Sequence, residues 1–256
     1  MKNLSLMEVH RLARFLDTQR RVVKSIESAV DDFLFFYPHL FPGGEKYRDI
    51  TLVIGSERGF CGNFNELLLR ALNDRIGLAA EAARVVVGGR LAAKLADDHR
   101  VVAFLDGPTV VEEVEPVLAK LMETLGSPNV AVDPTVPIRL TVFHHESVAE
   151  DVNVTVLQPF QQPEPETKRF AFAPELNLAP QEFLAGLGEQ YLFALLHGLL
   201  YDSLMAENQR RMQHMDSAVR QLERRSEAFL LKRNALRQEE ITEEIEVIML
   251  SVDALR

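Results

Sequence analysis

The residues best suited to chemistry lie in one short segment, Ser56-Glu-Arg-Gly-Phe-Cys-Gly-Asn-Phe-Asn65, between a predicted strand and a predicted helix. Glycines ahead of a helix can let its backbone amides approach a phosphate group. The segment contains neither a GxxxxGK motif nor GxGxxG, and no acidic residue stands at the end of the next strand, where a ribose would need one. A tight strand–helix turn requires glycines equally. A structural turn is favoured, and a nucleotide-binding α/β enzyme is the alternative.

The other candidate nucleophiles and metal ligands are isolated from one another. Cys61 is the single cysteine, so it forms no intrachain disulfide, and without a paired base it is predicted to be a small buried side chain rather than a nucleophile. His144 and His145 are adjacent on a predicted strand and point to opposite faces, so they cannot bind one metal. His197 is expected to be a core histidine with its hydrogen bonds satisfied. We therefore expect no catalytic, cofactor-binding or metal-binding residues.

Composition excludes further classes of protein. The 256 residues include 28 Lys and Arg and 38 Asp and Glu, a net charge of −10, which argues against a nucleic-acid partner. The N-terminal residues have no apolar run typical of a secretory signal. The densest apolar stretch, Tyr191 to Met205, is interrupted by polar residues and is shorter than the ~20 residues that a membrane span needs. We expect a peripheral protein with no direct membrane insertion.

Proline and glycine divide the chain into parts. Neither occurs from Met1 to Tyr37, and no proline follows Pro180. Proline-free ends around a turn-rich centre predict two long helices flanking a compact domain. We therefore expect an N-terminal coiled-coil helix over 1–37, a central α/β domain over 46–160, a linker over 161–180 and a C-terminal coiled-coil helix over 181–256.

The central part alternates strand and helix patterns. Buried apolar runs are followed at short intervals by amphipathic stretches, which is typical of an α/β sheet with crossover connections, a Rossmann-like arrangement. The last two strands are close enough in sequence to form an antiparallel pair. The predicted strands are 49–56, 84–89, 100–105, 138–143 and 152–157, and the predicted helices are 64–76, 90–97 and 110–125.

Heptad patterns mark both terminal helices. A helix over 181–255 would be about 110 Å long and would need a partner, for which the N-terminal heptads are the candidate. The sequence thus predicts an intramolecular antiparallel coiled coil, with a surface helix packed on a core as the alternative for the N-terminal segment. The N-terminal heptad positions are Val9, Leu12, Leu16, Gln19, Val23, Ile26, Val30 and Phe33. The C-terminal ones are Met212, Met215, Val219, Leu222, Phe229 and Leu236, then, after a stutter, Ile241, Ile245, Ile248, Val252 and Leu255.

Charge is segregated along the C-terminal helix. Eight basic residues lie between Arg210 and Arg237, an acidic run follows from Glu239 to Glu246, and the tip from Val247 to Leu255 is largely apolar. The acidic run has no interleaved ligands for a metal, so it is expected to be a solvated face. An exposed apolar tip implies a partner that surrounds it.

Two motifs resemble the gamma subunit of the F-type ATP synthase. The segment 56–65 is similar to the family's S-D/E-R-G-L-C-G-G/A-F/L-N. The segment from Glu207, ENQRRMQHMDSA, resembles S-E-x-x-x-R-M-x-A-M-x-x-A, and the segment from Asn234, NALRQEEITEEIEVI, resembles N-x-x-R-Q-x-x-I-T-x-E-L/I-x-E-I. The resemblance covers about residues 49–256.

The resemblance implies a central rotor stalk that is not itself catalytic. The helix pair would sit in the bore of a hexamer of alpha and beta subunits. The α/β domain would stand with the epsilon subunit on the membrane ring of c subunits, at the cytoplasmic face. Ion flow through the ring would drive rotation and so ATP synthesis or hydrolysis.

The resemblance also implies roles for individual residues. Arg237 and Gln238 match a pair that hydrogen-bonds beta, and Thr242 follows them. Met212 and Met215 would lie in the shaft. The remaining predicted rotor contacts are Ile245, Ile248, Val252 and Leu255, and the motif-loop residues are Arg58, Gly59, Cys61, Gly62 and Asn65.

The N-terminal helix departs from the family pattern. Only Thr18-Gln19 of the family's N-T-Q-K-I-T-K-A-M segment is kept, and Arg21 stands where isoleucine is usual. The interval from there to Ser56 is shorter than in the ordinary subunit, and Glu239 and Glu240 replace small residues. These departures indicate a divergent branch, such as the gamma subunit of an alternative ATPase. A gamma-like paralogue acting as an assembly or regulatory protein is the other interpretation.

Overall fold

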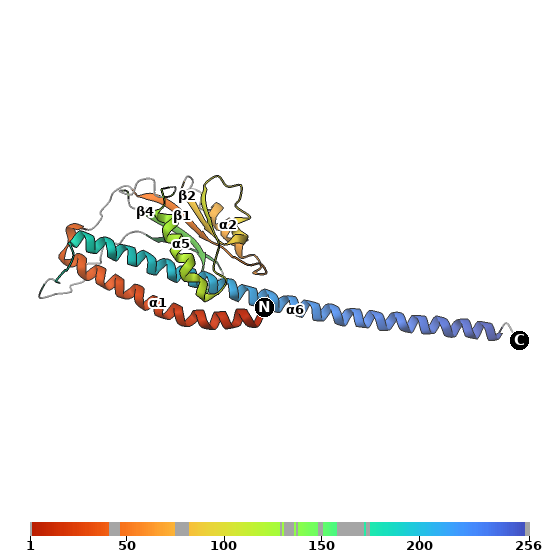
Figure 1. Ribbon diagram of the computed structural model, residues 1–256. Helices are drawn as coiled ribbons and strands as arrows, with labels where there is room; N and C mark the ends of the chain where they lie inside the picture. Colours follow the sequence, from red (N-terminus) through yellow and green to blue (C-terminus); the bar gives the residue numbers. More distant parts are fainter. Residues whose placement is uncertain are drawn as a thin grey trace. The chain divides into compact units, whose positions relative to one another are not determined.

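A computed structural model describes residues 2–40, 47–74, 82–128, 138–147, 151–157 and 175–253, with single residues 130, 136 and 172 between them (Figure 1). The chain divides into two compact units, Met1–Met212 and Gln213–Arg256. Helix α6, Pro180–Asp253, contributes to both units. Most of the predicted linker 161–180 lies outside the described residues. The C-terminal helix begins at Pro180, a favourable first helical residue because proline has no N–H to leave unsatisfied.

A single mixed sheet forms the centre of the first unit. Its strand order is β3-β2-β1-β4-β5; the first four strands are parallel to their neighbours, and β5 pairs with β4 antiparallel. This confirms the predicted α/β sheet and its antiparallel terminal pair. The strands are β1 Arg48–Ile54, β2 Ala83–Val87, β3 Val101–Leu105, β4 Ile138–His145 and β5 Val152–Leu157.

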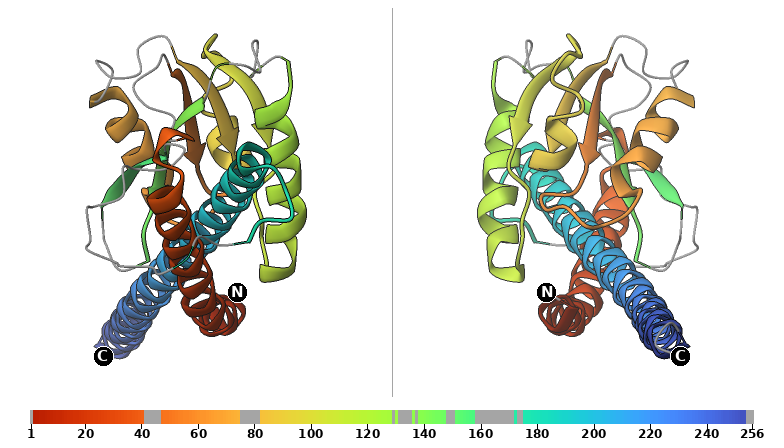
Figure 2. Two further views of the ribbon diagram at one scale, coloured as in Figure 1. Left: turned by 90° about the vertical axis from the view of Figure 1, so that its left-hand side faces the viewer. Right: turned by 90° about the vertical axis from the view of Figure 1, so that its right-hand side faces the viewer.

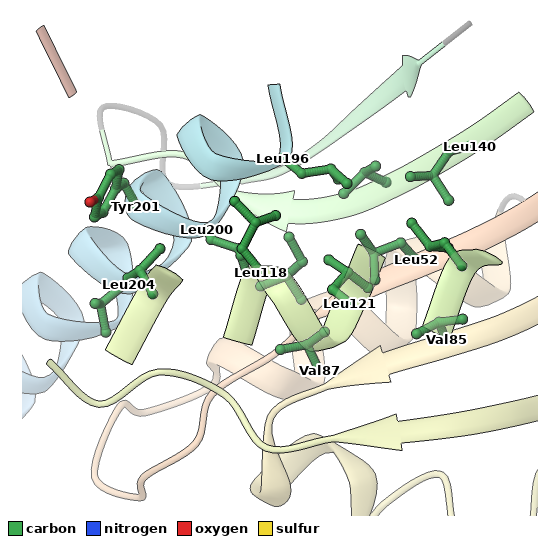
Figure 3. Close-up of a cluster of buried hydrophobic side chains, with 14 of the residues drawn as sticks. Leu52, Val85, Val87, Leu118, Leu121, Leu140, Leu196, Leu200, Tyr201 and Leu204 are labelled. Carbon is green, nitrogen blue, oxygen red and sulfur yellow. The ribbon is translucent and has the colours of Figure 1, made fainter. Parts of the chain in front are cut away.

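Helices cover both faces of the sheet (Figure 2). Alternate residues of β1 supply the two sides: Leu52 packs with α5, Val114–Gly126, and α6, whereas Val53 packs with α2, Phe64–Asp74. Figure 3 shows the first of these cores, in which Leu118 and Leu121 of α5 meet Leu196 and Leu200 of α6 over the strands. A short 3-10 turn, η2 Val111–Glu113, precedes α5.

The helix predicted over 90–97 is shorter than expected. Helix α4 spans only Gly89–Ala92. Beyond it the chain turns, and Asp98 pairs with the buried Arg84 at the start of β2 and also with Arg100. The local helical pattern therefore yields to an ion-pair cluster that fixes the turn into β3.

The N-terminal helix pairs with the first half of α6. Helix α1, Lys2–Phe36, ends just before Pro38, and η1, Pro38–Leu40, follows it. Its Phe15 ring lies 5.6 Å from that of Tyr201, Gln19 donates to the Ala194 carbonyl at 2.8 Å, and the Phe33 ring lies 5.0 Å from that of Phe183. Position along α1 rises as position along α6 falls, so the pairing is antiparallel, as predicted.

The place of this pairing differs from the heptads that suggested it. The α1 contacts fall on residues 183–204 of α6 and precede Met212. The predicted α1 positions do form the contact face: Leu12, Leu16, Val30 and Phe33 are buried, while most flanking residues are exposed. In the second unit, the side chains of residues 219–249 are all exposed.

Among the described residues, one helix is long and apolar enough to cross a membrane, judged by length and composition alone: Pro180–Met249. A single such helix is weak evidence, since core helices of soluble proteins meet the same criterion. In this chain Leu196, Leu200 and Leu204 of that helix are buried in the core of the first unit.

Candidate functional site

The motif loop, residues 56–65, is closed at its base by one asparagine. The side-chain oxygen of Asn65 accepts the backbone N–H of Ser56 at 3.0 Å, and its amide donates to the Ser56 hydroxyl at 2.9 Å. Gly62 has a φ of 63° and Phe60 a φ of 66°. That region of backbone space suits glycine and strains an ordinary residue, and Phe60 is also 60% exposed. Gly62 therefore serves the turn, as predicted.

Glu57 occupies the place where an α/β fold of this kind could take a phosphate. Its carboxylate accepts the backbone N–H groups of Gly89 and Gly107, each at 2.7 Å, which follow β2 and β3. In open α/β sheets, ligands bind beyond the carboxyl ends of the strands. Because the chain's own carboxylate takes these donors, the structure weighs against the nucleotide-binding alternative.

The second motif meets the first. Glu207 of α6 accepts the backbone N–H groups of Glu57 and Arg58, each at 3.3 Å, and pairs with Arg211 one turn later. Arg211 donates to the Gly59 carbonyl at 3.3 Å and to the side-chain oxygen of Asn208 at 2.9 Å. We call Glu207, Asn208 and Arg211 the latch. Its residues come from one helix, and its targets come from one loop.

The latch is buried. Glu207 is 4% exposed and Arg211 7% exposed. Burial raises the pKa of Glu207, while the guanidinium of Arg211 and the loop amides oppose that shift. A buried carboxylate requires such partners, since an uncompensated one would be costly. The loop backbone is therefore part of what keeps the ion pair in place.

Further polar contacts join the loop and α1 to the same segment, residues 109–113. Arg58 donates to the Thr109 hydroxyl at 3.2 Å, and that residue donates to Glu113. Next to it, Glu8 of α1 accepts the backbone N–H of Val111 at 3.3 Å, and Arg11 of α1 pairs with Glu112. Helices α1 and α6 thus both contact segments that follow strands at the carboxyl end of the sheet.

The isolated candidate side chains are structural. Cys61 is buried, its thiol lies 3.6 Å from the Arg58 carbonyl, and burial raises its pKa. His145 bonds the Phe64 carbonyl at 2.9 Å, and His144 bonds Thr155 at 3.1 Å. Burial lowers the pKa of both rings, that of His145 to about 4. No group of three or more potential metal-binding side chains occurs in the described ranges.

His197 corrects one prediction. It was expected to be a satisfied core histidine, but its Nε2 is buried without a hydrogen-bond partner among the described residues. The ring instead stacks on Tyr201, with centroids 4.5 Å apart, and lies beside Phe193. The helix interface around it offers aromatic faces rather than polar partners, and this desolvation lowers its pKa.

The predicted rotor contacts lie on the second unit. Arg237, Gln238, Thr242, Ile245 and Ile248 are all exposed, and the Thr242 hydroxyl donates to the Gln238 carbonyl at 2.8 Å. At spacings of three and four residues, most of them share one face of the helix. The side chain of Val252 and all of Leu255 lie outside the described residues.

Sequence reasoning missed the latch and Glu57. Glu207 and Arg211 both belong to the quoted segment that begins at Glu207, but neither is given a role there, and Arg211 also counts among the basic residues of the helix. The available signal was an acid–base pair four residues apart directly after an apolar stretch, where an exposed pair would not be expected.

Comparison with known proteins gives the family. Residues 1–255 match the family model described as ATP synthase. The ATP synthase gamma chain of Clostridium beijerinckii is 27% identical over 243 residues, which are 92% of this chain and 82% of that one. The chain belongs to the ATP synthase gamma family. Another gamma chain, from Helicobacter pylori, is 30% identical over 115 residues, 43% of this chain and 38% of that one.

Solved structures agree in fold with this gamma-family chain. A chain from the central stalk and c-ring of Tetrahymena thermophila mitochondrial ATP synthase has a TM-score of 0.59 at 15% identity, covering 86% of this chain and 97% of that one. A chain of Euglena gracilis mitochondrial ATP synthase has a TM-score of 0.56 at 12% identity, covering 99% and 94%. The sheet with two terminal helices is thus the fold of known stalk proteins.

Proposed function

We propose that this chain is the central-stalk rotor of an F-type ATPase, coupling ion flow across a membrane to ATP synthesis or hydrolysis. In this role it is not catalytic itself. The second unit enters a hexamer of alpha and beta subunits, and the α/β domain contacts the epsilon subunit and the c ring at the cytoplasmic face of the membrane. Family membership and the central-stalk fold support this proposal.

The observation that carries the proposal is the exposed helix of the second unit. Large apolar side chains there stand in contact with solvent, among them Phe229 at 71%, Leu231 at 72% and Ile248 at 61% exposure. Such a surface is typical of a segment that a partner covers. Basic residues up to Arg237 and acidic residues from Glu239 to Glu246 lie along the same helix, so charge as well as shape can set how a surrounding partner aligns with it.

The first test is reconstitution with the alpha and beta subunits of the same source. The proposal expects a stable complex with ATPase activity and ATP-driven ion transport. A chain that never enters the hexamer contradicts it. Rotary activity with this chain as the sole gamma excludes the alternative suggested by the divergent N-terminal motif, that of an assembly or regulatory paralogue.

The second test addresses Arg237 and Gln238. Replacing both with alanine should reduce ATPase turnover by about tenfold while the complex still assembles, because each loses hydrogen bonds that the proposed contact with beta makes during rotation. The chain offers a matched control, Arg220→Ala with Gln221→Ala, which removes the same dipeptide from the same helix. Arg220 makes an exposed ion pair with Asp216, which contributes little. Equal turnover in the two double variants would refute the contact.

A further inference from the structure

The contacts between the α/β domain and α6 are of two kinds. Apolar side chains such as Leu196 and Leu200 pack against the sheet and α5. Hydrophobic burial by itself is not directional, and these interdigitated side chains resist both separation and rotation of the helix through their packing. The latch is directional, because the Glu207 carboxylate must face the amides of Glu57 and Arg58.

Polar contacts gather at one level of α6. Besides the latch, Asp202 accepts the Ser147 hydroxyl at 2.7 Å, and Arg210 donates to Asn63 at 3.1 Å. A turn of the helix by one residue would move its side chains by about 100° and leave the buried Glu207 without its loop donors. The latch therefore fixes the rotational setting of α6 against the domain.

We propose that the latch is the coupling that carries torque between the α/β domain and the C-terminal helix, with Glu207 and Arg211 as positioning residues. The inference rests on the proposed function, since torque matters only in a rotor. The buried ion pair acts by holding one orientation. Replacing such a pair with apolar residues is often neutral for stability, so specificity of setting is what it supplies.

The positioning role is tested first in the isolated 256-residue chain. Glu207→Gln keeps the shape of the side chain and removes the charge that accepts two amides. Hydrogen exchange at the Glu57 and Arg58 amides should accelerate by about 10-fold or more, because charge-assisted hydrogen bonds are lost. Glu66→Gln is the control, because it breaks an exposed ion pair with Lys94 in the same domain. Unchanged exchange in Glu207→Gln overturns the positioning role.

The torque role is tested in the reconstituted complex. Glu207→Gln should lose ion transport per ATP hydrolysed while ATP hydrolysis continues, whereas Glu66→Gln should match the wild type. If Glu207→Gln transports as many ions per ATP hydrolysed as the wild type, the proposed torque role of the latch is wrong. Failure of the wild-type chain to assemble instead overturns the proposed function, and the exchange measurement still judges the positioning role.

A second variant covers the case in which Glu207→Gln does not fold. Arg211→Lys keeps the buried positive charge but cannot reach Glu207, Asn208 and the Gly59 carbonyl together, since a lysine presents one compact ammonium. It should retain the fold and show the same loss of transport ratio. A wild-type ratio in this variant counts against the latch.

Discussion

The boundary between the packed and the exposed part of α6 can be measured with one pair of substitutions. Leu200 is fully buried between the sheet, α5 and α1, whereas Leu222 on the same helix is 65% exposed. Leu→Ala at a buried site removes the transfer free energy of the side chain and leaves a cavity, a loss of about 3–4 kcal/mol in unfolding free energy. At the exposed site the change should stay within ~0.5 kcal/mol.

These losses convert to distinct melting temperatures. The first unit spans Met1–Met212. In a domain of this size, each kcal/mol lost from the unfolding free energy lowers Tm by about 2–4 °C. Leu200→Ala should therefore lower the Tm of the isolated chain by roughly 6–16 °C. Leu222→Ala should lower it by about 2 °C or less. Differential scanning calorimetry at neutral pH measures both. Equal shifts in the two variants would refute the assignment of the core to the first half of α6.

Three further predictions concern ionisable groups of the first unit. The hydrogen bond from Arg100 lowers the pKa of Asp98 from 3.8 to about 2, so the contribution of Asp98 to the unfolding free energy is present above pH 4 and is lost as pH falls through 2. Asp98→Asn should therefore lower the unfolding free energy by about 2 kcal/mol at pH 7. Denaturant titrations should show the difference between variant and wild type shrinking below about pH 4. Burial lowers the pKa of His145 from 6.5 to about 4, so the stability that depends on its neutral ring is present above pH 6.5 and is lost as pH falls through 4. Acidification over that range should lower the unfolding free energy by up to about 3 kcal/mol. His145→Gln can still bond the Phe64 carbonyl, and its unfolding free energy should fall less steeply with pH. The Cys61 thiol, buried and with a raised pKa, should react with a disulfide reagent at pH 8 at least about tenfold more slowly in the native than in the denatured chain, and comparable rates would contradict its burial.

Sequence periodicity predicted those elements whose apolar residues follow a regular helix or strand spacing. The α1 seam from Leu12 to Phe33 follows a heptad, and the central apolar runs follow the strand pattern, so both could be read directly. The predicted length of α4 was wrong because the pairing of Asp98 with Arg84, 14 residues apart, outweighed the local helical pattern. The α1 partner was placed too far along α6 because a heptad shows that a helix has a partner, not which partner it has.

The spacing of Glu207 and Arg211 hinted at an ion pair, but the contact of the latch with the loop could not be predicted from spacing. Glu207 and the amides of Glu57 and Arg58 are about 150 positions apart in the sequence. The donors are backbone N–H groups, which every residue except proline has, so the sequence does not reveal them. Motif similarity identified both segments but did not show that they contact each other in the fold. The structure supplies that reason, since one motif provides the carboxylate and the guanidinium that the loop of the other requires.

The assembled complex should reverse the comparison of Leu200 with Leu222. If alpha and beta surround the second unit, Leu222 becomes at least partly buried, and Leu222→Ala should weaken association by about 5- to 30-fold, equivalent to ~1–2 kcal/mol. Leu200 is already buried in the free chain, so Leu200→Ala should leave the affinity unchanged at temperatures where the variant is folded. Titration of each variant into the alpha–beta hexamer measures this. Unchanged affinity for Leu222→Ala would mean that no partner covers that face, and the proposed place of the shaft would have to move further toward the C-terminal end.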